Sequence, residues 1–209
     1  MTRRWFLRQS GRTLAVLPIV SSMPVLGRAA TAGATLQSIP ASVLKRIGIT
    51  TVCFRDRFAS TRGKNAEPLA AGQELTLLSA PKFIADTLGL HNVEIWSSQF
   101  ADTSIDYCRT IKAAAAVAQS RIINIQVDGS DNLSDPDVAK RTASIATIKQ
   151  WMDRAAAVGA PTLRANTGGG SPEAWDVNRT ADSFRQLAEY CKKIGVKIRM
   201  PGVRSRKVP

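Results

Sequence analysis

Three apolar helical stretches in this chain each end in a glycine that is followed, within a few residues, by a β-like run. The junctions are Gly89 before residues 93–96, Gly159 before residues 162–165 and Gly195 before residues 196–198. Glycine ends a helix readily because it adopts the left-handed conformation without a Cβ clash. Helices that alternate with strands in this way predict βαβ units and a parallel sheet. In such folds the functional side chains gather at the carboxyl ends of the strands.

Residues 1–34 have the order of features found in a twin-arginine secretion signal. Arg3 and Arg4 precede an aromatic pair and a leucine, and a mostly apolar stretch over residues 14–26 leads into small residues. The apolar stretch is short and interrupted by prolines and serines, so no stable membrane insertion is expected after cleavage. The order predicts delivery by the export machinery to the periplasm or another extracytoplasmic space. A basic tail before a fraying helix is the alternative.

The formal charge of +13 comes from the two ends of the sequence. Residues 1–30 carry five arginines and residues 192–209 carry seven lysines or arginines, with no acid in either segment. The remaining 17 basic residues face 16 acids. A nucleic-acid-binding protein needs a basic face on its folded body to displace counterions from phosphates. We therefore expect no nucleic-acid partner.

The three cysteines, Cys53, Cys108 and Cys191, are widely spaced and form no metal-binding pattern. Cys53 falls within a predicted strand, while Cys108 and Cys191 fall on apolar helix faces. Small buried cysteines are common at such positions, so burial is expected for all three. One intramolecular disulfide is the alternative.

The rest of the chain predicts a single domain of about five βα units. Strands are expected over 47–54, 93–96, 121–128, 162–166 and 196–200. Helices are expected up to residue 88, from Ser104, over 137–158 and over 178–194.

Alternation within the strands separates an apolar face from a polar face. Ile123, Ile125 and Val127 alternate with polar residues in the third strand, and the fourth strand repeats this pattern. A doubly wound sheet has helices on both faces, so both faces of its strands should be apolar. A (β/α) barrel can turn polar side chains inward. The polar face therefore favours a barrel over a doubly wound sheet.

Four segments carry a family resemblance. They are Ile47-Gly48-Ile49, Leu88-Gly89-Leu90-His91-Asn92-Val93-Glu94-Ile95-Trp96-Ser97, Ile122-Ile123-Asn124-Ile125-Gln126-Val127-Asp128 and Leu163-Arg164-Ala165-Asn166-Thr167-Gly168-Gly169. In this order they resemble the opening strands of the xylose-isomerase-like TIM barrels, the sugar phosphate isomerase/epimerase group. The resemblance implies a partial (β/α)8 barrel over residues 45–200.

The same resemblance implies a divalent metal, Mg²⁺, Mn²⁺ or Co²⁺, in full-length relatives, where it assists proton transfer on a sugar. The family's fifth strand ends in a metal-binding glutamate, but Pro201 stands at that position here. A complete barrel needs about 250 residues, and residues 201–209 form a basic tail unlike the family. We therefore expect a form truncated after the fifth strand that binds no metal and is inactive. A non-catalytic exported carbohydrate-binding or remnant protein of the same fold is the alternative.

Four side chains end their strands on the inward face and are candidates to contact a small sugar or sugar phosphate. They are Trp96, Gln126, Asp128 and Asn166. Trp96 could equally plug the barrel interior. One layer deeper, Glu94 and Arg164 are expected to form a buried ion pair. No catalytic residue is assigned.

Other polar features have simpler explanations. His91 precedes the second strand, at the end of a barrel associated with stability. The glycine-rich stretch 167–171 could cradle a phosphate but fits an ordinary loop better. Asp131, Asp135 and Asp137 resemble loop ligands, although helix capping by Asp135 or Asp137 explains them at least as well. The first and fifth strands would be open edges, so edge-to-edge self-association is expected.

Overall fold

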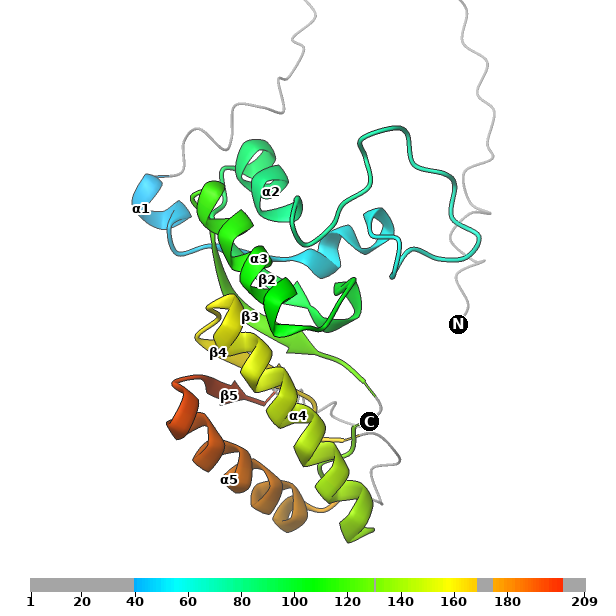
Figure 1. Ribbon diagram of the computed structural model, residues 1–209, viewed down its shortest axis with the longest axis vertical. Helices are drawn as coiled ribbons and strands as arrows, with labels where there is room; N and C mark the ends of the chain where they lie inside the picture. The colour runs from blue at the N-terminus through cyan, green and yellow to red at the C-terminus, as the bar shows by residue number, and fades with distance from the viewer. Residues whose placement is uncertain (1–39, 130, 169–174, 201–209) are drawn as a thin grey trace, which may run out of the picture. The chain divides into compact units, whose positions relative to one another are not determined.

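The computed structural model describes residues 40–129, 131–168 and 175–200. In this part of the chain, five parallel strands form one sheet in the order β1-β2-β3-β4-β5 (Figure 1). The strands are β1 (Gly48–Thr50), β2 (Asn92–Trp96), β3 (Arg121–Val127), β4 (Thr162–Ala165) and β5 (Lys197–Arg199). Each strand pairs with the next one in sequence, so the chain advances across the sheet in one direction.

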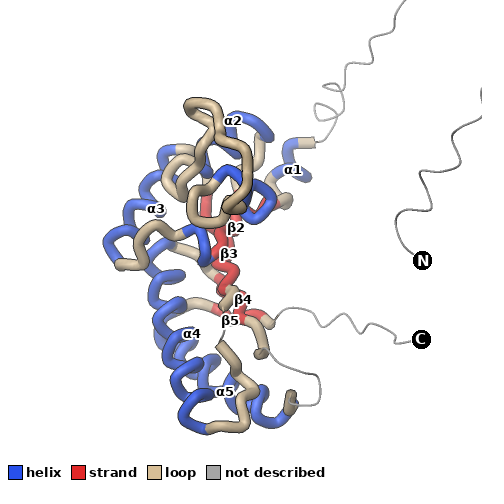
Figure 2. Tube along the Cα trace, turned by 90° about the vertical axis from the view of Figure 1, so that its right-hand side faces the viewer, coloured by secondary structure: helices blue, strands red, loops and turns tan. Residues whose placement is uncertain are grey.

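The connecting helices lie on one side of this sheet. They are α2 (Ala80–Leu88), α3 (Ile105–Val117), α4 (Val138–Val158) and α5 (Val177–Ile194). Three short helices precede or follow the first two strands: α1 (Ala41–Leu44), η2 (Thr51–Arg57) and η3 (Ser97–Gln99). Figure 2 shows α3, α4 and α5 along the same side of the strands. A doubly wound sheet reverses its strand order and places helices on both faces. The sequential order and one-sided cover are those of a partial (β/α) barrel, so the predicted fold class is confirmed.

Helix boundaries follow the local sequence signals. Gly89, Gly159 and Gly195 end α2, α4 and α5 in the left-handed conformation, with φ of 64°, 81° and 73°. At the other ends, the side chains of Ser104 and Asp137 accept hydrogen bonds from main-chain N–H groups of α3 and α4. The glycine junctions and both helix starts are therefore confirmed.

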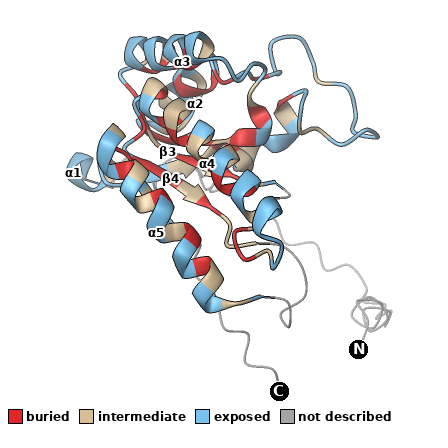
Figure 3. Cartoon of the chain, turned by 60° about the horizontal axis from the view of Figure 1, so that its bottom comes forward, coloured by how far each residue is buried: buried red, intermediate tan, exposed pale blue. Residues whose placement is uncertain are grey.

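The hydrophobic core lies between the sheet and its helices. Ile95, Ile125 and Leu163 from the strands are fully buried, as are Ile148 and Leu187 from α4 and α5. Figure 3 shows the buried residues on the strands and on the sheet-facing sides of the helices, while the outer helix faces are exposed. Burial of apolar surface thus fixes which face of each strand meets the helices.

The first predicted strand is too long. β1 covers only Gly48–Thr50, and residues Thr51–Arg57 form the 3-10 helix η2. The Thr50 side chain accepts a hydrogen bond from the Val52 N–H at 3.4 Å, which helps to start this helix. Cys53 is therefore exposed on η2, whereas Cys108 and Cys191 are buried, and all three are free thiols. The expectation of burial holds for two of the three.

The predicted alternation of β3 is wrong at one position. The β2–β3 register shifts between Val93 and Glu94, where a β-bulge inserts Ile123 between the residues paired with them. Ile122 takes the core position and is 3% exposed. Ile123 instead faces a hollow beside Asn124. Regular alternation resumes at Ile125 and Val127, so the rest of the strand keeps its predicted faces.

The proposed signal over 1–34 and the basic tail over 201–209 lie outside the described residues. The barrel predicted over 45–200 begins at β1 and runs to β5 within them. Among the residues that the structure describes, no helix is long and apolar enough to cross a membrane.

Candidate functional site at the polar face of the sheet

Polar side chains form rows across the face of the sheet that lacks helices. Residues paired between parallel strands lie at one height, so the strand register defines each row. From the amino-terminal to the carboxyl end, the first two rows are Thr50, Glu94, Asn124, Thr162 and Lys197, and then Trp96, Gln126, Arg164 and Arg199. Asp128 and Asn166 directly follow β3 and β4 and form a third row, joined by a hydrogen bond between their side chains. All four predicted sugar-facing residues belong to the two rows nearest the carboxyl end.

The carboxylate of Asp128 connects the two rows nearest the carboxyl end of the sheet. Its Oδ1 accepts hydrogen bonds from the Arg164 guanidinium and from Asn166 Nδ2, the latter at 3.0 Å. Its Oδ2 accepts one from Gln126 Nε2 at 2.7 Å. We call Gln126, Asp128, Arg164 and Asn166 the Asp128 cluster. The structure thus brings three of the four predicted site residues into direct contact.

The backbone around Asp128 is also fixed. The Asp128 N–H donates to the Ser97 hydroxyl oxygen at 3.2 Å, and Ser97 directly follows β2. This bond ties the carboxyl ends of β2 and β3 together. Ser97 was not among the predicted site residues, although it directly follows a strand end, which is the signal that could have identified it.

The row below the Asp128 cluster has its own hydrogen bonds. Asn124 Nδ2 donates to Glu94 Oε2 at 2.7 Å, and Thr162 Oγ1 donates to Asn124 Oδ1 at 2.7 Å. The predicted ion pair between Glu94 and Arg164 is therefore wrong. Arg164 instead reaches the carboxylate one row nearer the carboxyl end, while an amide satisfies Glu94.

A cavity of about 480 Å³ opens beside these rows. Glu94, Asn124, Thr162, Arg164 and Arg199 line it. Trp96 does not line it, although its register position is next to Gln126. Both sequence alternatives for Trp96, stacking on a sugar or plugging the interior, therefore stay predictions.

Two buried nitrogens in the second row have no hydrogen-bond partner among the described residues. They are Trp96 Nε1 and Arg164 Nε, both N–H donors. A buried donor without an acceptor is costly, so both favour an acceptor such as a hydroxyl or a water at this face. The row is consequently rich in donors.

This donor-rich set does not fit a divalent metal. Hard cations take several oxygen ligands from carboxylates, carbonyls and waters. Both oxygens of Asp128 already accept hydrogen bonds, and β5 presents Lys197 and Arg199. Within residues 40–129, 131–168 and 175–200, no three His, Cys, Asp or Glu side chains come together as a metal site.

The other predicted polar features also have places in the structure. His91 directly precedes β2, at the amino-terminal end of the sheet, as predicted. Asp137 Oδ1 accepts from the Ala139 and Lys140 N–H groups, which confirms the capping interpretation. Burial raises the pKa of Asp131. Most of the glycine-rich stretch, from residue 169, lies outside the described residues.

Comparisons with known proteins identify the fold's relatives. The sequence profile described as xylose isomerase-like TIM barrel matches residues 83–200. A search of curated proteins found no match.

Solved structures share the fold at low sequence identity. A putative xylose isomerase from Rhodospirillum rubrum has a TM-score of 0.55 and 17% identity over 72% of this chain and 51% of its own. A D-psicose 3-epimerase from Clostridium cellulolyticum H10, solved with D-tagatose, has a TM-score of 0.52 and 18% identity over 72% and 50% of the two chains. Another D-psicose 3-epimerase, solved in the presence of D-fructose, has a TM-score of 0.51 and 17% identity over 59% and 46%.

The chain therefore spans about half the length of the structures it resembles. The profile match covers more than half of the 209 residues and includes four of the five strands. With the sequential parallel sheet and its one-sided helices, this match places the chain in the xylose isomerase-like TIM barrel family.

Proposed function

We propose that this chain carries the sugar-recognition part of an isomerase or epimerase fold and binds a small sugar at the Asp128 cluster without interconverting it. The observation that carries the proposal is the convergence of Gln126, Asp128 and Asn166 at the carboxyl ends of β3 and β4. Active sites of barrels lie at this end of the strands. The solved relatives named for sugar isomerases and epimerases support a sugar as the ligand.

The chemistry of the cluster suits hydroxyl groups. Amide groups both donate and accept hydrogen bonds, and a sugar hydroxyl does the same. The side chain of Asp128 is 31% exposed, so a ligand can reach the carboxylate from solvent. Trp96 Nε1 and Arg164 Nε, which have no hydrogen-bond partner among the described residues, add two donors to the same region.

Interconversion of sugars needs more than contact. The family route, as the resemblance implies it, uses a metal together with an acid and a base. The described carboxylates Glu94 and Asp128 belong to different rows, and each is engaged by a neighbouring donor. Binding demands fewer fixed groups than catalysis, so these residues suit sugar binding better than proton transfer.

The test titrates the purified chain with D-psicose, D-tagatose and D-fructose, and follows binding by ligand-observed NMR. We expect weak binding, in the millimolar range typical of a few hydrogen bonds to an open site, at roughly 4 kcal/mol. Asn166→Ala should abolish the signal. Asn178→Ala removes the same side chain from an exposed position on α5 and should leave binding unchanged.

A turnover assay with Mg²⁺, Mn²⁺ or Co²⁺ completes the test. Metal-dependent interconversion of a ketose pair that Asp128→Asn abolishes would refute the non-catalytic part of the proposal. Sugar binding that Asn166→Ala leaves intact would refute the assignment of the site.

A further inference from the structure

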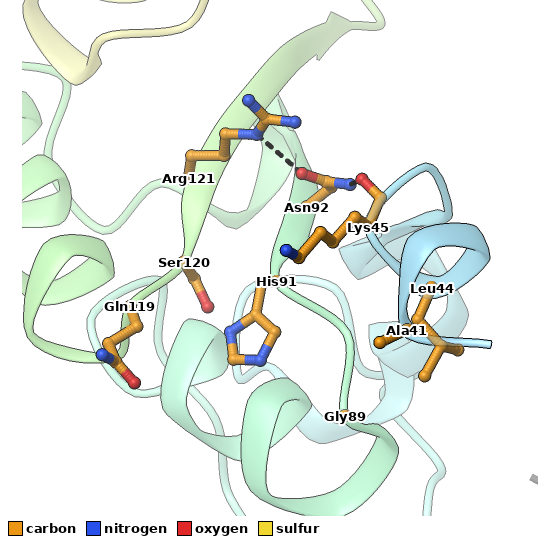
Figure 4. A pocket seen from close by; sticks show the side chains of 9 residues that line it. All are labelled: Ala41, Leu44, Lys45, Gly89, His91, Asn92, Gln119, Ser120 and Arg121. Carbon is orange, nitrogen blue, oxygen red and sulfur yellow. Dashed lines mark hydrogen bonds between the residues drawn. The ribbon is translucent and has the colours of Figure 1, made fainter. Parts of the chain in front are cut away.

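A second hollow lies at the opposite end of the sheet from the Asp128 cluster. It sits where β2 and β3 begin and measures about 620 Å³ (Figure 4). We call it the amino-end pocket. Its polar lining consists of Lys45, His91, Asn92, Gln119, Ser120 and Arg121. Ala41 and Leu44 of α1 add an apolar wall. The amino-end pocket contains none of the residues of the predicted site or of the proposed sugar site.

The lining of the amino-end pocket is basic. It holds Lys45, His91 and Arg121, and no Asp or Glu of the described residues lines it. Arg121 Nε donates to Asn92 Oδ1 at 2.7 Å, which holds the guanidinium stem in place. Asn92 Nδ2 donates in turn to the main-chain oxygens of Lys45 and Ile47, both at 2.9 Å. These bonds fix the Arg121 side chain and the Lys45 main chain beside the pocket.

No acidic side chain among the described residues forms an ion pair with the basic groups of the amino-end pocket. Across the described residues, neither the Lys45 ammonium nor the His91 ring has a hydrogen bond or ion pair. The two helices α2 and α3 end beside the pocket, and helix carboxyl ends attract cations. That attraction is electrostatic and needs no hydrogen bond, so it accounts for part of the positive charge at this end of the sheet. At the end of α3, the carbonyls of Ala114, Ala115 and Ala116 accept main-chain N–H groups.

The loop after α3 is held in an unusual backbone conformation. Gln119 has φ of 51°, the one positive φ among the described non-glycine residues. The Gln119 and Ser120 N–H groups bond back to α3 at 2.9 and 2.8 Å, which fixes this turn. The turn brings the Gln119 amide and the Ser120 hydroxyl into the pocket lining beside His91 (Figure 4). A left-handed residue with these two bonds is a common way to end a helix, so the turn is a fixed part of the pocket wall.

We propose that the amino-end pocket binds a phosphate monoester with a small organic part. A lysine is a common phosphate ligand, and an ammonium, an imidazole N–H, a hydroxyl and an amide together offer the several donors that a phosphate group accepts. The cavity is larger than a phosphate group alone, and Ala41 and Leu44 can contact the organic part. Lys45, His91 and Gln119 are exposed, so the ligand can enter from solvent.

The test uses the full chain and two probes, inorganic phosphate and phenyl phosphate, at constant ionic strength set with sodium chloride. Backbone amide NMR shifts of Gln119 and Ser120 report binding. Phenyl phosphate should bind more tightly than inorganic phosphate because it also contacts the apolar wall. Lys45→Gln and His91→Gln should each weaken phenyl phosphate binding about tenfold, as expected for a lost hydrogen bond to a charged group.

Lys140→Gln is the matched control, since it removes one exposed lysine from α4, away from the pocket. This variant should bind as the parent chain does. Unchanged amide spectra elsewhere establish that the variants fold. Equal shifts with sodium acetate, or binding that survives in the Lys45→Gln/His91→Gln double variant, would overturn the proposal.

Discussion

Replacing Asp128 with asparagine should destabilise the fold by about 1–2 kcal/mol. The carboxylate accepts hydrogen bonds from Gln126, Arg164 and Asn166, and asparagine keeps only one acceptor oxygen while losing the charge. A hydrogen bond to a charged group contributes about 1.5–3 kcal/mol. The Arg164 and Asp128 side chains are 27% and 31% exposed, so solvent screens part of this interaction and lowers the expected loss to about 1–2 kcal/mol.

Urea denaturation followed by circular dichroism gives the free energy of unfolding. Asp106→Asn is the matched control, because Asp106 pairs with Arg109 on the surface of α3 with side chains 88% and 68% exposed. The control should change stability by less than about 0.5 kcal/mol. A double-mutant cycle that combines Asp128→Asn with Arg164→Gln measures the interaction free energy between the two side chains. An Asp128→Asn variant as stable as the control variant, or a cycle without coupling, would refute the role assigned to the Asp128 cluster.

Three further outcomes are expected. Arg3 and Arg4 replaced together by lysine should leave the protein in the cytoplasm, since the twin-arginine route requires the arginine pair; periplasmic fractionation of the double variant decides this, and normal delivery would contradict the signal assignment. Cys53 should react with iodoacetamide well before Cys108 and Cys191, because it is exposed while burial covers the other two thiols and raises their pKa; mass spectrometry of the native chain over time measures the order, and equal rates would argue against the described core. The purified chain should self-associate through the edges of β1 and β5, which have no further strand partner among the described residues; sedimentation at increasing concentration tests this, and a single monomeric species throughout would speak against it.

Local sequence signals predicted most of the elements. Ser104, Asp137 and the three helix-ending glycines lie where the structure begins or ends its helices, because capping depends on a few neighbouring residues. Apolar periodicity likewise located four of the five strands to within one or two residues. The predicted length of the first strand is wrong because β-branched residues favour extended structure only weakly. A local turn at Thr50 outweighs that preference.

The sequence by itself determined the alternation of strands and helices and the polar face of the sheet. It also indicated that Gln126, Asp128 and Asn166 lie at the carboxyl ends of their strands. Only the tertiary structure decided which of them touch. Pairing between strands sets the height of each side chain, and one bulge in β3 moves Ile123 to the polar face. That same register places Arg164 within reach of Asp128, because partners so far apart in sequence meet only when the sheet forms.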